Sequence, residues 1–384
     1  MNAVVKHKVV FVATTPFAVN AFLRTHLLAF SRIYDVTLCV NTHAYPLAEE
    51  IVQAVRVWHI DIARKISPVQ DWRALLQLLH CLKEIKPTVV HSMTPKAGLL
   101  AMMAGWRMRV PNRLHTFTGQ VWSNRVGLTK SLLKLVDRLI VGCATQLFAD
   151  SQSQCRFLEV EGVVKQGAVS VLGKGSVAGV DLKRFHVDGA AREALRTKLQ
   201  IKDDVVVFLF VGRLSCDKGI SNLLESFGFV NAKHENTELW MVGPDEEGLK
   251  SVLEPMAKEM EINVRWFEPT FFPEQYIAAA DILVLPSFRE GFGSVIIEAA
   301  ACGIPAIAFE IDGVIDSVVS KKTGVLVEPG NWGAYADAMA LMLEDSKLRL
   351  EMGANAYNRV VKYFSSHAIT FAWLAYYERL LSKC

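Results

Sequence analysis

The sequence lacks the signatures of several protein classes. Its seven cysteines are scattered, odd in number and never spaced as Cys-x-x-Cys. Neither a zinc ribbon nor a disulfide scaffold is therefore expected, and a reducing, cytoplasmic environment is favoured. Beyond the first 30 residues, no run of about 18 apolar residues occurs, so no membrane-spanning helix is predicted. No low-complexity tract is present.

The N-terminus imitates a signal peptide, because Lys6 and Lys8 precede an apolar stretch over residues 9–23. Asn20, Arg24 and His26 suit an amphipathic helix better than an apolar signal core. We therefore predict a first strand, a turn and a helix in this region.

Length and charge indicate two domains. A chain of 384 residues, about half of them hydrophobic, exceeds the usual size of one domain. Residues 1–186 hold 23 Lys and Arg against 11 Asp and Glu, whereas residues 187–384 hold 19 against 28. The balances of +12 and −9 suggest a domain boundary and a negatively charged partner for the first half.

Apolar runs alternate with helical patterns in both halves, which predicts parallel sheets covered by helices on both faces, an α/β fold. The expected helices include 75–85 and 130–145. The expected strands are 9–13, 36–40, 55–60, 89–91, 113–117, 147–149 and 170–172 in the first half, and 205–211, 238–242, 264–267, 282–285, 306–309 and 324–327 in the second.

The most informative segment spans residues 281–305. A buried strand ends at Pro286, and a helix is expected to begin at Ser294. A glycine-rich turn between a strand and a helix N-terminus can bind an anion, because unpaired N–H groups and the helix dipole point at one spot. Glu290 lies at the mouth of that turn and Glu298 about one helical turn inside, so carboxylates flank the predicted anion site.

This segment, with Gly303 and Pro305 following, resembles the Glu-x7-Glu motif of family 4 retaining glycosyltransferases with the GT-B fold. An ordinary surface acidic pair is the alternative. The resemblance implies two Rossmann-like domains that face each other across a cleft. It assigns 1–186 to the acceptor, 187–363 to a nucleotide-sugar donor, and 364–384 to a C-terminal helix that packs back on the first domain. Residues 173–185 resemble the family's interdomain connection.

A second motif, residues 211–219, follows a strongly apolar strand and contains Gly212, Arg213 and Lys218. In the family, the arginine and lysine hold the donor's diphosphate, whose negative charge grows as it departs. Two solvated loop cations are the alternative. The sequence contains no Asp-x-Asp, the pair that binds a divalent ion in many enzymes of the other glycosyltransferase fold, so neither a required metal nor another cofactor is expected.

The resemblance also implies the remaining donor-site residues. The donor site is expected to include Gly212, Gly243, Pro244, Gly291, Phe292, Gly293, Ser294 and Glu298. Relatives place the nucleotide base near the loops at 240–247 and 268–272, and uracil is expected from family habit.

Three residues of the first half complete the predicted site. His115 lies near the place where family members have a histidine that contacts the donor sugar, although a lone histidine is more often a core residue. Residues 91–98 resemble relatives that act on polyprenyl-diphosphate-linked sugars. Within this segment, Lys96 could bind an acceptor diphosphate or could equally be a solvated loop lysine. Gly119 is the other expected acceptor-site residue.

A basic segment over 96–138 contains eight cations and one acid, with Trp106 and Trp122 among its apolar residues. Such a face suits an anionic membrane surface, and a solvated face with core residues is nearly as compatible. No nucleic-acid-binding motif accompanies the charge.

These patterns together predict a cytoplasmic retaining glycosyltransferase, with peripheral attachment to the inner face of the cell membrane as one option. It would move a hexose or N-acetylhexosamine from a UDP-sugar to a saccharide acceptor in O-antigen, capsule or glycan assembly. A polyprenyl-diphosphate-linked saccharide is the expected form of that acceptor. A nucleotide-sugar 2-epimerase of the same fold is the rival enzyme. A catalytically silent sugar-nucleotide binding module is the rival from another class.

Overall fold

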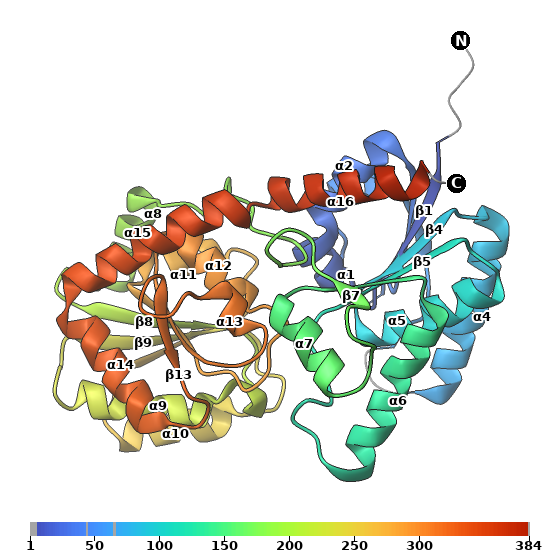
Figure 1. Ribbon diagram of the computed structural model, residues 1–384. Helices are drawn as coiled ribbons and strands as arrows, with labels where there is room; N and C mark the ends of the chain where they lie inside the picture. The colour runs from blue at the N-terminus through green and yellow to red at the C-terminus, as the bar shows by residue number, and fades with distance from the viewer. Residues whose placement is uncertain (1–5, 44, 64–66, 383–384) are drawn as a thin grey trace. The chain divides into compact units, whose positions relative to one another are not determined.

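The computed structural model describes residues 6–43, 45–63 and 67–382. Its contacts divide the chain into two compact units, Met1–Gly179 with Ser366–Cys384, and Val180–Ser365 (Figure 1). The divisions fall after residues 179 and 365, whereas the sequence predicts them after residues 186 and 363. The first falls earlier because Val180 is buried in the core of the second unit and donates its N–H to the Phe364 carbonyl at 2.7 Å.

The first unit contains a seven-stranded parallel sheet in the order β3-β2-β1-β4-β5-β6-β7. Its central strands β1, β2, β4 and β5 are almost entirely buried, as expected where helices cover both faces of a sheet. The bounds of the strands are β1 Lys8–Val12, β2 Asp35–Val40, β3 Arg56–His59, β4 Val89–Ser92, β5 Asn112–Phe117, β6 Gln146–Ala149 and β7 Val169–Ser170.

Two helical layers enclose this sheet. Helices α4, α5 and α6 pack side by side over one face, and α2 and α16 pack over the other. The helices are α1 Pro16–Ala18, a π-helical turn Val19–Leu23, α2 Arg24–Ile33, α3 Glu49–Ala54, α4 Pro68–Ile85, α5 Pro95–Arg107, α6 Gly127–Cys143, α7 Gln152–Val160 and α16 Ser366–Leu381.

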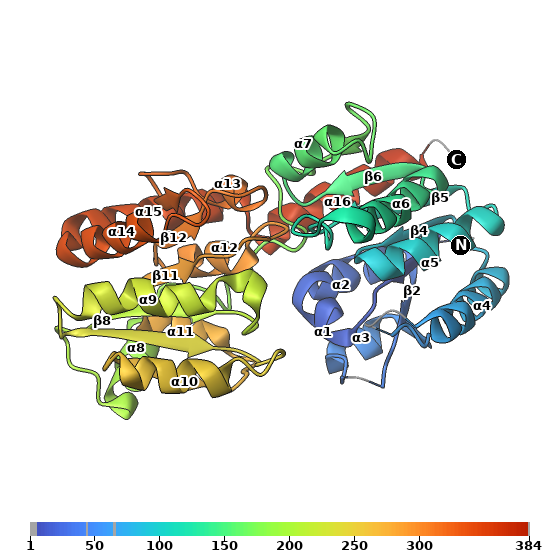
Figure 2. The same cartoon turned by 90° about the horizontal axis from the view of Figure 1, so that it is seen from below.

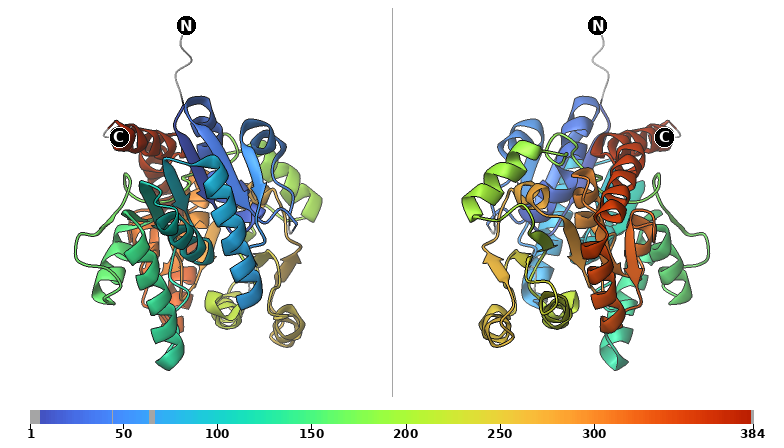
Figure 3. Two further views of the ribbon diagram at one scale, coloured as in Figure 1. Left: turned by 90° about the vertical axis from the view of Figure 1, so that its right-hand side faces the viewer. Right: turned by 90° about the vertical axis from the view of Figure 1, so that its left-hand side faces the viewer.

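The last helix belongs to the first unit and packs there through aromatic side chains (red in Figure 3). The Tyr377 ring stacks on Phe11 of β1 and meets Phe30 of α2 edge-on at 4.8 Å. The Trp373 ring lies 4.9 Å from that of Phe148. These contacts account for the aromatic composition of the C-terminal segment.

The second unit contains a six-stranded parallel sheet in the order β10-β9-β8-β11-β12-β13. Its strands are β8 Val206–Val211, β9 Thr237–Val242, β10 Val264–Phe267, β11 Ile282–Leu285, β12 Ala306–Phe309 and β13 Gly324–Val327.

Helices again form two layers: α9 packs beside α10 and α14, while α12 packs beside α11 and α15 (Figure 2). The helices are α8 Gly189–Leu199, a 3-10 turn Cys216–Lys218, α9 Ile220–Asn231, α10 Lys250–Glu259, α11 Pro273–Ala279, α12 Ser294–Ala301, α13 Val314–Ser317, α14 Trp332–Glu344 and α15 Ser346–Tyr363.

Both sheets reverse their strand order once, between β1 and β4 and between β8 and β11. At such a point the loops after the two central strands diverge and leave room for a ligand at the carboxyl ends of the strands. The second of these points carries the residues that the sequence singled out. In the described part of the chain, no helix combines the length and apolar character needed to cross a bilayer.

Candidate active site

The loops after β8 and β11 meet at the strand-order reversal of the second unit. Lys218 ends the 3-10 turn after β8, and its Nζ donates to Oε1 of Glu290 in the loop after β11. Both side chains are mostly buried. The two motifs found in the sequence thus form one charged cluster, although 72 residues separate them.

A second ion pair ties the same loops together. Nη2 of Arg289 donates to Oδ2 of Asp217 at 2.7 Å, and the Phe288 N–H donates to the Asp217 carbonyl at 2.9 Å. Burial opposes ionisation of Asp217, but a hydrogen bond from Ser215 and the charges of Arg289 and Lys218 lower its pKa overall. Asp217 is therefore a fixed anion that holds the cationic loop in place.

Two glycines permit the loop after β8 to lie close to the loops after β11 and β9. Gly219 has a φ of +67°, and a Cβ there would lie 2.5 Å from the Pro286 carbonyl oxygen. Gly243, after β9, has a φ of +144°, and a Cβ there would lie 1.9 Å from the Gly212 carbonyl oxygen. A side chain at either position would force the loops apart.

Arg213 lies in the same loop as Lys218, and its Nη1 donates to Oε2 of Glu246 at 2.9 Å. Burial favours the neutral guanidinium, but the carboxylates of Glu246, Asp217 and Glu290 outweigh burial and raise the pKa of Arg213. The site therefore holds two basic side chains, each paired with a carboxylate that a phosphate could replace.

The glycine-rich turn leads into α12 as predicted. Gly293 is the N-cap of that helix with a φ of +71°, and no described side chain caps the helix that begins at Ser294. A Cβ on Gly313, before α13, would lie 2.3 Å from the Gly291 carbonyl oxygen, so α13 backs the turn closely. Phe292 is buried and packs its ring against Phe364 at 5.3 Å. The turn is held rigidly and presents a helix N-terminus.

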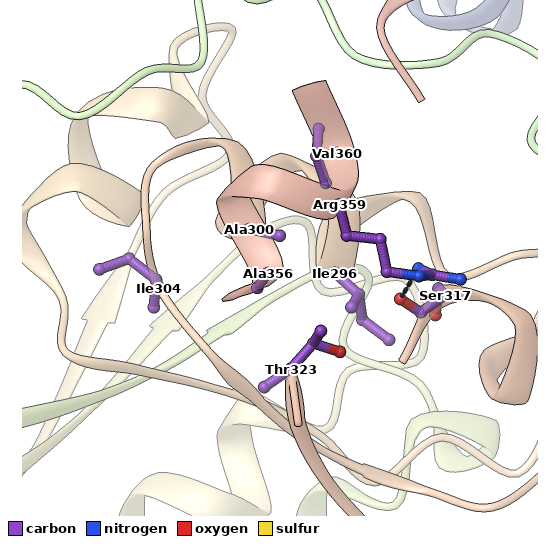
Figure 4. Close-up of a pocket in the computed structure, with 9 residues that line it drawn as sticks. Ile296, Ala300, Ile304, Ser317, Thr323, Ala356, Arg359 and Val360 are labelled. Atoms are coloured by element: carbon purple, nitrogen blue, oxygen red, sulfur yellow. Dashed lines mark hydrogen bonds between the residues drawn. The ribbon is translucent and has the colours of Figure 1, made fainter. Parts of the chain in front are cut away.

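Arg359 of α15 fixes α13 behind this turn (Figure 4). Its guanidinium donates to the carbonyl oxygens of Ser317 at 2.7 Å and Asp316 at 2.6 Å, at the C-terminal end of α13. The space that Arg359 shares with Ile296 and Thr323 leaves no room for a water molecule. Packed side chains therefore fill the space behind the turn.

Glu298 lies on α12, about one turn beyond its start at Ser294. Burial raises the pKa of its carboxyl group to about 7; the charge of Arg184 opposes this shift and that of Glu274 adds to it. The residue as a whole is only partly buried, so other atoms of Glu298 remain exposed although its carboxyl group is shielded from water. A carboxyl group that is half protonated near neutral pH can both donate and accept hydrogen bonds.

A pocket of about 320 Å³ lies at the carboxyl ends of β9 and β10. Its lining includes Gly243, Pro244, Trp266 and Glu268. The resemblance predicts the nucleotide base near two loops, 240–247 and 268–272, and both loops contribute residues to this pocket. The pocket has an aromatic wall at Trp266, and Lys250 and Asp245 also line it.

His115 lies inside the first unit. It is 1% exposed on β5, its Nδ1 is 2.8 Å from Ser92 Oγ, and a Cβ on Gly98 would lie 2.3 Å from its ring. Burial lowers its pKa to about 3, so the ring is neutral. This is the setting of a histidine packed beneath α5, and its contact with a donor sugar stays a prediction.

The two predicted acceptor residues also belong to the first unit. Nζ of Lys96, in the first turn of α5, donates to Oδ1 of Asp71 at 2.8 Å. Gly119 follows β5 with a φ of +89°. Lys96 is thus already paired with a carboxylate, which an acceptor phosphate would have to displace.

Four residues of the second unit's cluster and pocket are not among the predicted site residues. Asp217, Glu246 and Arg289 pair across loops, and Trp266 walls the pocket. Asp217 adjoins Lys218 and Arg289 adjoins Glu290, so proximity to the motifs was the available signal.

Family models match both units. The model of glycosyl transferases group 1 matches residues 191–359, and that of a glycosyl transferase 4-like domain matches residues 26–175. The Staphylococcus aureus capsular polysaccharide biosynthesis glycosyltransferase CapM is 32% identical over 311 residues, 81% of either chain. The chain is a family 4 glycosyltransferase. Its predicted GT-B fold is confirmed by the two parallel sheets and by the structural likeness described next.

Two further proteins are similar to this chain, one in sequence and one in structure. The Escherichia coli UDP-Gal:alpha-D-GlcNAc-diphosphoundecaprenol alpha-1,3-galactosyltransferase is 26% identical over 339 residues, 86% of either chain. The structure of Anabaena HepE in complex with UDP and glucose superposes with a TM-score of 0.81 at 18% identity, over 98% of this chain and 100% of that one. Neither the epimerase nor the silent binding module is favoured, because both family models and both sequence relatives are glycosyltransferases.

Proposed function

We propose that this glycosyltransferase moves a sugar, with retention, from a UDP-sugar to a polyprenyl-diphosphate-linked saccharide in surface polysaccharide assembly. The observation that carries the proposal is the cluster of Lys218, Arg213 and Glu290 beside the glycine-rich turn. The named relatives support its finer parts: one acts on UDP-Gal and a diphosphoundecaprenol-linked acceptor, another serves capsule synthesis, and HepE was solved with UDP and glucose.

The proposed chemistry is a front-face displacement. The bond from the anomeric carbon to the diphosphate oxygen breaks, and its electron pair stays on that oxygen. The acceptor hydroxyl oxygen bonds to the same face of the anomeric carbon, and its proton passes to the departing phosphate. Glu290 orients the sugar hydroxyls, and Glu298 binds the ribose.

Charge on the leaving diphosphate is the main electrostatic demand of this step. Lys218 and Arg213 are positioned cations, and the α12 N-terminus after Gly293 adds backbone N–H groups and the positive end of a helix dipole. We propose that these groups stabilise the leaving group without a required metal ion.

The donor base would occupy the pocket beside Gly243 and Pro244. Trp266 offers an aromatic wall for stacking, and the pocket adjoins the loop of Arg213 through Leu214, whose N–H donates to the Pro244 carbonyl at 2.8 Å. A nucleotide that places its base here has its phosphates at the neighbouring loop of the same unit.

A panel of nucleotides tests the donor assignment. UDP is expected to raise the melting temperature of the protein, because a ligand that binds only the folded state stabilises it by mass action. GDP, ADP and CDP at the same concentration should shift it less. Release of UDP from one UDP-sugar should continue in excess EDTA. A larger shift with GDP would contradict the base assignment, and activity lost in EDTA and restored by magnesium would contradict the metal independence.

A lipid-linked acceptor implies that the enzyme works at a membrane, and the exposed face of α6 is suited to contact one. Leu128, Leu132, Leu135 and Leu139 recur along one side of this helix and are 49% to 89% exposed. The only acid of this helix, Asp137, is buried and accepts a hydrogen bond from Trp122 Nε1 at 2.7 Å. The exposed face of α6 is therefore apolar without negative charge, which suits the boundary of an anionic bilayer.

Several cations of the basic segment 96–138 already have partners within the protein, so they are less available to bind a membrane. Lys130 and Lys134 pair with Glu161 at 2.9 Å each, and Arg113 donates to backbone carbonyls. Trp122 is fully buried, whereas Trp106 is 59% exposed. We propose that the leucines of α6, with Trp106 on the adjoining α5, dock the enzyme peripherally on the cytoplasmic face of the membrane.

Leu132→Ser combined with Leu135→Ser is expected to reduce co-sedimentation with anionic vesicles at low salt. Both leucines are exposed, so the fold should remain intact, and each buried CH₂ lost at the interface weakens binding by about 0.8 kcal/mol. Leu350→Ser, at an exposed leucine of α15, is the matched control. Equal recovery of wild type and the double variant would remove α6 from the docking surface.

A further inference from the structure

Three metal-binding side chains gather at the carboxyl ends of β2 and β3 in the first unit. His43 lies in the loop after β2, His59 ends β3, and Asp61 follows it. One ligand atom from each lies within 4.8 Å of the others, and the two imidazole rings are 4.2 Å apart. Within residues 6–43, 45–63 and 67–382, no other three such side chains lie so close together.

Two of these side chains are held by further hydrogen bonds. His59 Nδ1 is 2.8 Å from Thr42 Oγ1, and its Nε2 is 2.9 Å from Asp61 Oδ1. Gln77 donates to the other oxygen of Asp61 at 2.9 Å and accepts from the Asp61 N–H at 2.8 Å. Partners of this kind, which fix the ring and the carboxylate from behind, accompany protein metal ligands.

We propose that His43, His59 and Asp61 bind one divalent transition metal ion of the zinc class. Imidazole and carboxylate are zinc ligands at about 2.0–2.2 Å, and three protein ligands leave the fourth tetrahedral position for water or a ligand oxygen. In the metal-free protein, the proton on His59 Nε2 is shared with Asp61. In this state Nδ1 accepts from the Thr42 N–H at 3.3 Å. The metal replaces the Nε2 proton, which moves through solvent to Nδ1, so the ring stays neutral. Nδ1–H then donates to Thr42 Oγ1 in place of the bond from the Thr42 N–H.

His43 is the third ligand that distinguishes this cluster from a simple hydrogen bond between His59 and Asp61. Its side chain is exposed, so rotation about its side-chain bonds brings a ring nitrogen to the metal at little cost. Among the residues that the structure describes, His234 and Glu344 form a histidine–carboxylate pair with no third metal-binding side chain beside it: His234 Nε2 is 3.3 Å from Glu344 Oε1. That pair is the matched control, because it offers a metal the same two groups but no third one.

The test is calorimetric titration of the purified full chain with Zn²⁺, together with the absorption spectrum of added Co²⁺. We expect one zinc ion per chain in wild type, at least tenfold weaker binding in His43→Ala and in Asp61→Asn, and unchanged binding in His234→Ala. The Co²⁺ spectrum should show the ligand-field bands of a four-coordinate site without a thiolate charge-transfer band.

His43→Ala removes only an exposed side chain, so its unfolding curve without metal should match that of wild type. Zinc binding of equal affinity in wild type and His43→Ala would overturn the proposal. A thiolate band in the Co²⁺ spectrum would do the same, because it would place the metal at a cysteine such as the exposed Cys216. Neither readout requires sugar transfer, so this result is independent of the proposed function.

Discussion

Lys218→Ala is expected to lower turnover about ten- to a hundredfold while leaving the fold intact. Lys218 is the most buried cation of the cluster, and its bond to a departing diphosphate would strengthen as charge develops. Loss of one charge-assisted hydrogen bond costs ~1.5–3 kcal/mol, which is about ten- to a hundredfold in rate. Because the interaction grows in the transition state, kcat should fall more than the donor KM rises. Steady-state kinetics with the donor found in the nucleotide panel provide the measurement.

Arg213→Ala should act in the same direction, since Arg213 shares the loop and carries the second cation. Lys347→Ala is the control: it removes an exposed positive charge from the same unit and should leave both constants unchanged. Near-normal kcat in both Lys218→Ala and Arg213→Ala would contradict the assignment of these cations to the diphosphate. Circular dichroism of each variant separates a lost interaction from a lost fold.

The strands and their order of appearance could be predicted from the sequence because they depend on local patterns. Fully buried parallel strands are continuous apolar runs, and residues 205–211 and 282–285 are clear examples. The glycine-rich turn was equally readable, because Gly293 must adopt a positive φ where the chain enters α12. Once β8 and β11 are neighbours, the loops that follow them must meet, and the pairing of Lys218 with Glu290 follows.

Side-chain environments could not be predicted in the same way, because they depend on distant partners. The enclosure of the His115 ring by Ser92 and Gly98 is one example, because both lie well before His115 in the sequence. The cations of 96–138 looked like a free basic face, but Glu161, outside that segment, neutralises two of them. Trp122 was expected at a membrane surface, and it is buried instead over the Asp137 carboxylate. Each difference arises from a contact between segments that composition does not reveal.

Burial of three histidines couples the stability of the first unit to pH. Burial lowers the pKa of His26 to about 4 and those of His91 and His115 to about 3. His26 joins Thr370 of α16 to the Val177 carbonyl at 2.8 and 2.7 Å, and His91 contacts Tyr377 of α16 at 2.9 Å. These rings hold the terminal helix on the sheet in their neutral form.

The sign of the pH effect follows from these pKa values. The unfolded chain protonates its histidines near pH 6.5, whereas the folded unit does so only near pH 3 to 4. Below pH 6.5 the unfolded state therefore binds more protons, and stability falls as pH falls, by about 1.4 kcal/mol per pH unit for each histidine. Asp137 opposes this, since burial raises its pKa to about 6 and the folded unit takes up that proton first.

Acidification from pH 7 to pH 5 is therefore expected to destabilise the first unit, with a net uptake of about two protons on unfolding near pH 5. Urea unfolding at half-unit pH intervals measures this slope. His91→Gln should lower the slope by about one proton, because glutamine keeps hydrogen-bonding capacity near Tyr377 and Thr116 but does not titrate. His80→Gln, at an exposed histidine of α4, should leave the slope unchanged. Whatever the cost of His91→Gln to absolute stability, the slope reports only the proton count. A slope that is equal in wild type and His91→Gln would show that His91 takes up its proton in the folded unit, and that the α16 contact does not require the neutral ring.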